Sequence, residues 1–127
     1  MNPKPCLLLV DDDERNLIFY EALLQGRGFT IVKARDGLEA LDRFPKCRPD
    51  LVIVDLMMPQ LNGFEFCARL RHTPYGRSVP ILMITGLNEE TMREKALQSG
   101  ANDFLPKPFQ SAEFVRRIHA LLNLPRS

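Results

Sequence analysis

Five short apolar segments alternate with five segments of helical periodicity, and this alternation limits what the chain can fold into more than any other feature. The apolar segments are Cys6–Val10, Phe29–Val32, Leu51–Val54, Ile81–Ile84 and Asp103–Leu105. Most are rich in Val, Ile and Leu on both faces, which is typical of parallel strands covered on both sides. Strict alternation with short connections implies right-handed crossovers and helices on both faces of the sheet. We therefore predict an α/β fold, with a single-domain, doubly wound, five-stranded parallel sheet.

Each predicted helix carries one apolar stripe, and most of the helices have recognisable end signals. The stripes are Leu17, Tyr20 and Leu24; Leu38, Leu41 and Phe44; Phe64, Cys67 and Leu70; Met92 and Ala96; and Phe114, Ile118, Leu121 and Leu122. The expected end signals are capping boxes at Asp36 with Glu39 and Asn62 with Glu65, N-caps at Asn88 and Ser111, and left-handed ends at Gly28 and Gly100.

Length and composition exclude several classes of protein. The 127 residues match one domain, which we expect to span residues 1–124, with a short tail at 125–127 and no output domain. The net charge of +1 lacks the basic excess of proteins that bind nucleic acid directly. Cys6, Cys47 and Cys67 are widely spaced, which favours buried free thiols over disulfides or a zinc site. No apolar stretch resembles a membrane span or signal peptide, so we predict a cytoplasmic protein without a membrane partner.

Polar residues follow four of the predicted strands, at the edge where open α/β sheets bind ligands. Asp11-Asp12-Asp13 follow the first strand, Asp55 the third, Thr85 the fourth and Lys107 lies just beyond the fifth. If the first and third strands are neighbours, at least two carboxylates share one cleft, and a cation or raised pKa values must relieve their repulsion. Oxygen ligands without His or Cys favour Mg²⁺ or Mn²⁺ over zinc.

Each of these residues also has an ordinary structural explanation. Asp13 and Glu14 fit a helix N-cap and its favoured negative charge. A single Asp or Thr at a strand end is often a turn residue, and Lys-Pro is often an exposed loop. The convergence of all four groups on one sheet edge is what favours a functional site.

The segments LLLVDDD, VIVDLMMPQLNGFE, PILMITG and GANDFLPKPF resemble the motif series of two-component response-regulator receiver domains. The resemblance covers nearly the whole chain and implies the flavodoxin-like strand order 2-1-3-4-5. The departures are small: Gly86 stands where Ala is common, Asn62-Gly63 replaces Asp-Gly, and Pro106 precedes the lysine. None of them removes a chemical group that the family uses.

The resemblance implies a role for each polar residue of the edge. The phosphorylated aspartate falls on Asp55, the acidic pair on Asp11 and Asp12, the hydroxyl on Thr85, the lysine on Lys107 and the aromatic switch position on Phe104. Asp12, Asp55 and the backbone carbonyl of Met57 would hold Mg²⁺, with Asp11 acting through bound water. Lys107 and Thr85 would contact the phosphoryl oxygens.

The resemblance has further consequences for the chain around these residues. The Lys107–Pro108 peptide bond would be cis, and Phe109 would pack beneath the last helix. Met57 and Leu87 would flank the path of an attacking water molecule. Both side chains are apolar, so we expect slow loss of the phosphoryl group.

The implied function is that of a signalling module, not of an enzyme acting on other substrates. A histidine kinase or histidine phosphotransfer protein would phosphorylate Asp55, and Thr85 and Phe104 would then remodel the surface formed by the last two predicted helices and the strand Asp103–Leu105 between them. A downstream effector or fused output domain would read that surface. A phosphorylation-dependent homodimer at the same face is a further expectation.

Two other functions fit the sequence less well. A phosphohydrolase of the haloacid-dehalogenase type needs a second Asp two residues after its nucleophile, where this chain has Met57. A nucleotide-binding flavodoxin-like protein is disfavoured because the sequence has no P-loop and no GxGxxG motif. His72 and His119 lie far from the acids in the predicted fold, and we interpret them as surface or core-edge residues.

Overall fold

The computed structural model describes residues 4–87 and 90–123, in which strands and helices alternate strictly. The strands are β1 (Cys6–Val10), β2 (Thr30–Ala34), β3 (Leu51–Asp55), β4 (Ile81–Thr85) and β5 (Asp103–Pro106). All four pairings between neighbouring strands are parallel, and the order is β2-β1-β3-β4-β5. The predicted fold class and strand order are confirmed.

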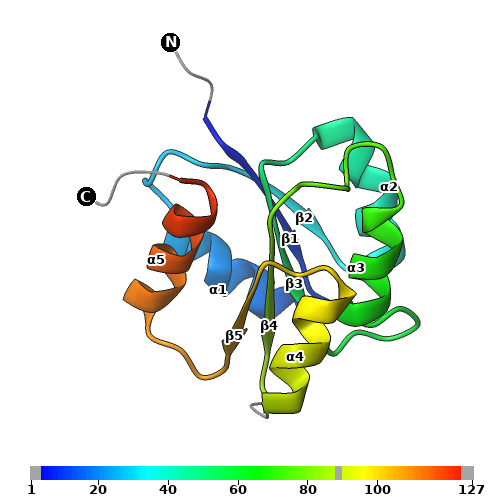
Figure 1. Ribbon diagram of the computed structural model, residues 1–127. Helices are drawn as coiled ribbons and strands as arrows, with labels where there is room; N and C mark the ends of the chain where they lie inside the picture. Colours follow the sequence, from blue (N-terminus) through cyan, green and yellow to red (C-terminus); the bar gives the residue numbers. More distant parts are fainter. Residues whose placement is uncertain (1–3, 88–89, 124–127) are drawn as a thin grey trace.

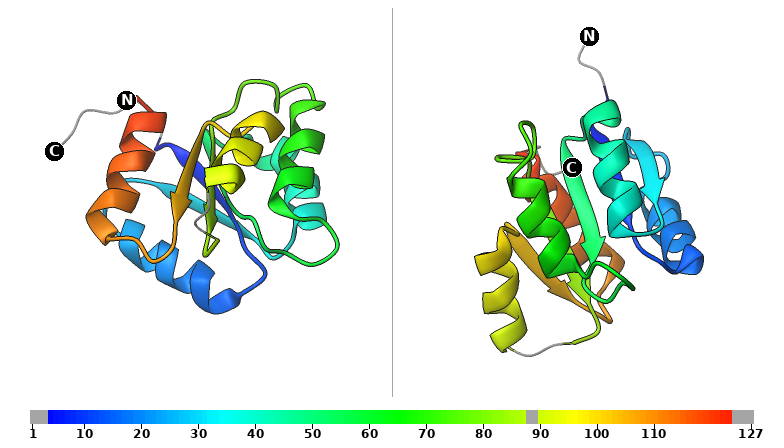
Figure 2. Two further views of the ribbon diagram at one scale, coloured as in Figure 1. Left: turned by 60° about the horizontal axis from the view of Figure 1, so that its bottom comes forward. Right: turned by 90° about the vertical axis from the view of Figure 1, so that its right-hand side faces the viewer.

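The helices form two layers, one on each face of the sheet. They are α1 (Glu14–Leu24), α2 (Gly37–Cys47), α3 (Gly63–Arg71), α4 (Glu90–Ser99) and α5 (Ser111–Leu121). Helices α1 and α5 cover one face, and α2, α3 and α4 cover the other (Figures 1 and 2). None of the helices in the described part of the chain has the length and apolarity needed to cross a membrane.

Strand residues alternate between two hydrophobic cores, as the pleat of a sheet requires. In β1, Leu7 and Leu9 pack into the core under α1 and α5, whereas Leu8 and Val10 face α2, α3 and α4. The predicted helix stripes agree in most positions, but the prediction for Leu38 was wrong. Leu38 is 48% exposed, because α2 buries the stripe of Gly37, Ala40 and Phe44 instead.

Some of the predicted helix caps are confirmed and others are not. Asn62 forms the complete capping box with Glu65. Only half of the box predicted at Asp36 forms: Asp36 accepts a hydrogen bond from the Glu39 backbone N–H at 2.7 Å, but the Glu39 side chain accepts from Arg43 instead. Ser111 is not an N-cap: α5 begins at this residue, and Gln110 precedes it without a side-chain cap. Asn88 lies outside the described residues.

The two glycine predictions also differ in outcome. Gly100 has a φ of 118° directly after α4, as expected. Gly28 also has a positive φ, of 87°, but α1 ends earlier, at Leu24, so this glycine shapes the turn into β2. Of the three free cysteines, only Cys67 is fully buried, so the predicted burial of Cys6 and Cys47 was too high.

Arg71, the last residue of α3, joins the α3–β4 and α4–β5 connections at the side of β4. Its guanidinium donates to the carbonyl oxygens of Gly76 at 2.8 Å, Val79 at 2.6 Å and Gly100 at 2.6 and 3.0 Å. It also donates to the Asn102 side chain at 2.9 Å. Five donated hydrogen bonds use the full donor capacity of arginine, so one side chain fixes the end of α4 against α3.

Candidate functional site

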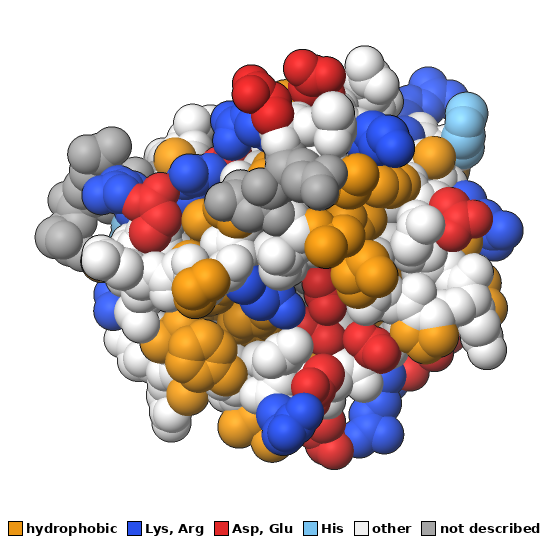
Figure 3. Space-filling view, turned by 90° about the horizontal axis from the view of Figure 1, so that it is seen from below, with side chains coloured by type: hydrophobic (Ala, Val, Ile, Leu, Met, Phe, Trp, Pro, Cys, Tyr) orange, Lys and Arg blue, Asp and Glu red, His pale blue; other side chains and the backbone are white. Residues whose placement is uncertain are grey.

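Three acidic side chains converge at the carboxyl edge of the sheet. Val10 of β1 pairs with Val54 of β3, and Asp11 and Asp55 lie one residue farther along the same two neighbouring strands. Asp11 and Asp55 are buried, whereas Asp12 is exposed, and one carboxylate oxygen of each lies within 4.8 Å of the others. Figure 3 looks onto this edge and shows acidic side chains gathered in the middle of the face, with hydrophobic side chains on both sides.

Hydrogen bonds from the start of α1 hold Asp11 in place. The Asp13 backbone N–H donates to Asp11 Oδ1 at 2.9 Å, and the Asn16 side chain donates to Oδ2 at 3.2 Å. Asp13 itself is the N-cap of α1, since its side chain accepts from the Arg15 backbone N–H at 2.9 Å. Its capping role, expected as the ordinary explanation, is therefore confirmed. Asn16 was not predicted as a site residue, because its only local signal is a polar residue beside the apolar Leu17.

The backbone at Asp55 is fixed by an unusually close approach of Gly63. A Cβ atom at Gly63 would lie 2.9 Å from Cα of Leu56 and 3.1 Å from the carbonyl oxygen of Asp55. The Gly63 backbone N–H donates to the Leu56 carbonyl oxygen at 2.9 Å. Only glycine fits here without moving the chain that carries Asp55.

Lys107 and Thr85 lie at the same edge as the acids. Lys107 Nζ lies 3.8 Å from Asp55 Oδ2, and its backbone N–H donates to the Thr85 carbonyl oxygen at 2.7 Å. Thr85 is fully buried, and its Oγ1 accepts a hydrogen bond from the Leu87 backbone N–H at 3.1 Å. The Lys107–Pro108 peptide bond is cis, as the resemblance implied.

Met57 and Leu87 stand in equivalent positions on two sides of the site. Each lies two residues beyond an edge residue, and each backbone N–H donates to that residue's side chain: Met57 to Asp55 Oδ1 at 3.4 Å and Leu87 to Thr85 Oγ1. Their side chains are 59% and 44% exposed. Two apolar side chains therefore border the acids in contact with solvent.

Phe104 and the other singled-out aromatic and histidine residues are not part of the acidic cluster. Phe104 is 2% exposed and belongs to the core beneath α2, α3 and α4. Phe109 lies against Phe114 of α5, with ring centroids 5.2 Å apart. His72 is the exposed C-cap of α3, and His119 is half-buried near the end of α5.

Burial and the charges of neighbouring acids raise the pKa of both buried acids. The pKa of Asp55 rises from 3.8 to about 6, first through burial and next through the charge of Asp11, while Lys107 acts in the opposite direction. Burial is also the main cause of the raised pKa of Asp11. The cluster is thus unfavourable as a set of bare anions, and a bound cation would relieve it. Its donors are all carboxylate oxygens, so the residues present fit a hard divalent cation such as Mg²⁺.

Replacement of Asp55 by Asn should stabilise the metal-free protein at pH 8 by about 1–2 kcal/mol. A carboxyl group whose pKa is raised on folding contributes stability below pH 4, and this contribution is lost as the pH rises through about 6. The amide does not titrate, so the difference between the variants should be small at pH 4 and should grow toward pH 8. Urea unfolding at both pH values measures this difference in stability. An Asp55→Asn variant that is less stable than wild type at pH 8 would contradict the raised pKa of Asp55.

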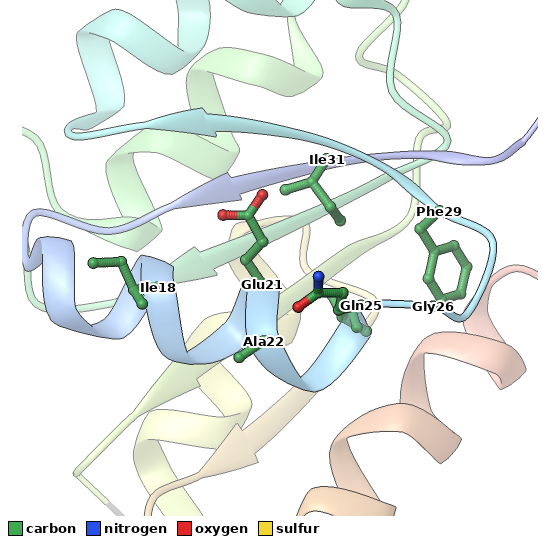
Figure 4. Close-up of a pocket in the computed structure, with 8 residues that line it drawn as sticks. Ile18, Glu21, Ala22, Gln25, Gly26, Phe29 and Ile31 are labelled. Atoms are coloured by element: carbon green, nitrogen blue, oxygen red, sulfur yellow. The ribbon is translucent and has the colours of Figure 1, made fainter.

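Two cavities border α1. One, of about 350 Å³, is lined by Asn16 and Lys107, which contact Asp11 and Asp55, and by Phe19, Tyr20, Pro108 and Phe109. The other, of about 490 Å³, lies between α1 and β2, where Figure 4 shows Ile18, Glu21 and Gln25 along the helix and Phe29 at the far end. None of the acidic site residues lines the second cavity.

Known proteins similar to this chain share its fold and much of its sequence. The curated response regulator MprA from Mycobacterium sp. (strain KMS) is 42% identical over 116 residues, 91% of this chain and 50% of that protein. The chain thus spans about half the length of such relatives. A putative response regulator from Chloroflexus aurantiacus J-10-fl superposes with a TM-score of 0.90 at 36% identity, covering 96% of this chain and 99% of that one.

A second solved structure is similar in fold and holds a metal ion of its own. The receiver domain of the sensor histidine kinase PA1611 from Pseudomonas aeruginosa PAO1, which has a magnesium ion in its active-site cleft, superposes with a TM-score of 0.86 at 32% identity. The match covers 94% of this chain and 98% of that one. The family model of the response regulator receiver domain matches residues 7–119. By sequence and by fold, this chain belongs to the response regulator receiver domain family.

Proposed function

We propose that this chain accepts a phosphoryl group on Asp55 from the phosphohistidine of a histidine kinase or histidine phosphotransfer protein. The observation that carries the proposal is the Asp55 carboxylate itself, which lies beside two other acids and 3.8 Å from Lys107 Nζ at the ligand-binding edge of the sheet. Family membership supports the same reaction. A Mg²⁺ ion, or Mn²⁺ in its place, would be held by Asp11, Asp12, Asp55 and the Met57 backbone carbonyl. When bound, it would neutralise the acids and the phosphoryl oxygens.

Three residues of the edge have separate roles in the phosphoryl transfer. A carboxylate oxygen of Asp55 bonds to phosphorus as the bond from phosphorus to the donor imidazole nitrogen breaks, and water protonates the leaving nitrogen. Lys107 supplies positive charge to one phosphoryl oxygen. The Thr85 hydroxyl already accepts from the Leu87 N–H, so its own proton is free to be donated to a second phosphoryl oxygen.

The output of this reaction is a changed surface rather than a released product. Thr85 and Phe104 face the same side of the sheet, because Met83, two residues before Thr85, pairs with Phe104 across β4 and β5. Movement of Thr85 toward the phosphoryl group would alter the packing of Phe104 under α4, and with it the face formed by α4, β5 and α5. A downstream effector or an output domain would bind this face in the cytoplasm.

Two measurements on wild-type protein test the proposal. Acetyl phosphate with Mg²⁺ should add the mass of one phosphoryl group, because a carboxylate nucleophile needs no protein donor when the acyl phosphate is reactive. A generic phosphomonoester should release no phosphate beyond the background rate, since Met57 supplies no general acid. Absence of labelling would contradict the phosphoacceptor role, and rapid phosphate release would favour a phosphohydrolase.

The apolar side chains at Met57 and Leu87 should make the phosphoryl group long-lived. Replacing them together by Asn and Glu places polar groups beside the acids, where they can orient an attacking water, and should shorten the lifetime several-fold. Loss of phosphate from purified phosphoprotein measures this. Leu97→Glu is a matched control, because it adds the same charge at an exposed leucine of α4. A double variant that decays no faster than this control would contradict the prediction.

Phosphorylation should also promote dimerisation through the face of α4, β5 and α5. Arg117 links this face internally, since its guanidinium contacts Asp103 of β5 at 2.8 Å and Glu113 of α5 at 2.7 Å. Arg93 and Lys95 add exposed positive charge on α4. Light scattering should show a larger mass with a beryllofluoride phosphoryl mimic than without it, and an unchanged monomer mass would contradict dimerisation.

A further inference from the structure

Tyr20 of α1 carries a buried hydroxyl group without a hydrogen-bond partner in the described part of the chain. The residue is 4% exposed, so bulk water does not satisfy this group. An unpaired buried hydroxyl is costly, and native proteins keep few of them. A phenylalanine would fill the same space without the cost, so the hydroxyl calls for an explanation.

The Tyr20 side chain points toward the acidic cluster. Tyr20 lies one helical turn after Asn16, and helical side chains tilt toward the N-terminus, which directs the ring toward the side chain that holds Asp11. Strand alternation places Asp11 and Asp55 on the face of the sheet that Tyr20 covers, with Leu9 and Ile53.

Two further observations place the ring beside the same residues. Tyr20 lines the cavity of about 350 Å³ together with Asn16 and Lys107. Burial raises the pKa of Tyr20, and the negative charges of Asp11, Asp55 and Asp13 raise it further.

We propose that the Tyr20 hydroxyl is a positioning residue for the acidic cluster: it donates a hydrogen bond to Asp11 when the cluster holds its divalent cation. This inference rests on the proposed function. Each oxygen of Asp11 accepts one hydrogen bond in the structure, which leaves a lone pair on each for the phenol. A donor held against the carboxylate fixes the orientation in which its oxygens meet a cation and its water ligands.

Packing alone does not account for the hydroxyl. The Tyr20 ring lies against Phe114 and Phe109, with centroids 5.4 and 6.2 Å away, and Phe would keep both contacts. A hydroxyl bonded in the metal-free protein would lose stability when it is removed, and a hydroxyl without any role would leave Mg²⁺ affinity unchanged. A hydroxyl that acts only in the cation-bound state should lower Mg²⁺ affinity when it is removed, without loss of stability in the absence of Mg²⁺.

The test is Tyr20→Phe, measured with and without Mg²⁺. Without Mg²⁺, the variant should unfold at the same temperature as wild type or a few degrees higher. Its dissociation constant for Mg²⁺, measured by calorimetric titration, should rise about 10-fold. Tyr75→Phe is the matched control: it removes the hydroxyl of the other tyrosine, which is 51% exposed and bonded to Arg48, and it should leave Mg²⁺ affinity unchanged.

A double-mutant cycle ties the effect to Asp11. In an Asp11→Asn background, Tyr20→Phe should change Mg²⁺ affinity less than 2-fold. A lower unfolding temperature of Tyr20→Phe without Mg²⁺, a Mg²⁺ affinity equal to wild type, or the full 10-fold loss in the Asp11→Asn background would each overturn the proposal. If wild type binds Mg²⁺ and is phosphorylated while Tyr20→Phe behaves identically, only this inference fails. If wild type does neither, the proposed function fails with it.

Discussion

Replacement of Asp55 by Asn is expected to abolish labelling by acetyl phosphate, so that intact-mass measurement finds only unmodified protein. The amide has no anionic oxygen to form the acyl phosphate. The same substitution should stabilise the metal-free protein, so loss of labelling cannot be attributed to unfolding. Few single-atom replacements in this chain should have a larger effect on its chemistry.

Two neighbouring acids provide controls for the Asp55 experiment. Asp12→Ala should slow labelling and weaken Mg²⁺ binding without abolishing the reaction, because a metal ligand is lost while the nucleophile remains. Asp13→Asn should label like wild type, since Asn also caps helices and Asp13 is the N-cap of α1. Unchanged labelling of Asp55→Asn, or complete loss of labelling in Asp13→Asn, would move the phosphorylated residue elsewhere.

Replacement of Arg71 by Ala is expected to lower the free energy of unfolding by about 3 kcal/mol or more. The side chain makes five hydrogen bonds from a charged donor, and its removal leaves several part-buried acceptors without their partner. Urea unfolding measures the loss. Arg71→Lys should recover only part of it, because an ammonium group cannot reach carbonyls in several directions as a guanidinium does.

Arg69 offers a matched control for this experiment. It lies two residues earlier on the same helix and is exposed. Arg69→Ala should therefore change stability by no more than about 0.5 kcal/mol. Equal losses for Arg69→Ala and Arg71→Ala would show that the network around Arg71 contributes little.

Much of the fold was predictable because its signals are local. The apolar runs of the strands and the Asn62 capping box each depend on a few consecutive residues. The acidic edge was predictable for a related reason, since parallel strands bring their carboxyl ends together whatever the loops do. Element ends were less certain: Asp55 is the last residue of β3 rather than the first residue after it, and α5 starts at the residue expected to cap it.

The features that escaped prediction depend on residues that are distant in sequence. Arg71 contacts Gly100 and Asn102, which are 29 and 31 residues away, and no local pattern marks it as different from Arg69. From the sequence, Tyr20 is one member of an apolar stripe, and its position near the acids becomes visible only when the strands beneath α1 are known. The exposure of Leu38 has the same origin, because a small shift in the buried stripe of α2 turns this residue outward.

Because Arg71 holds Gly100 in place, α4 can pivot around its C-terminal end. Within α4 only Ala96 is fully buried, and Met92 packs against the core in part. A ten-residue helix is about 15 Å long, and a tilt of about 10° around Gly100 displaces its far end by about 2.5 Å. A rearrangement that starts at Thr85, which precedes the N-terminal end of α4, would then displace the Glu90 end most, while the C-terminal end of the helix stays in place.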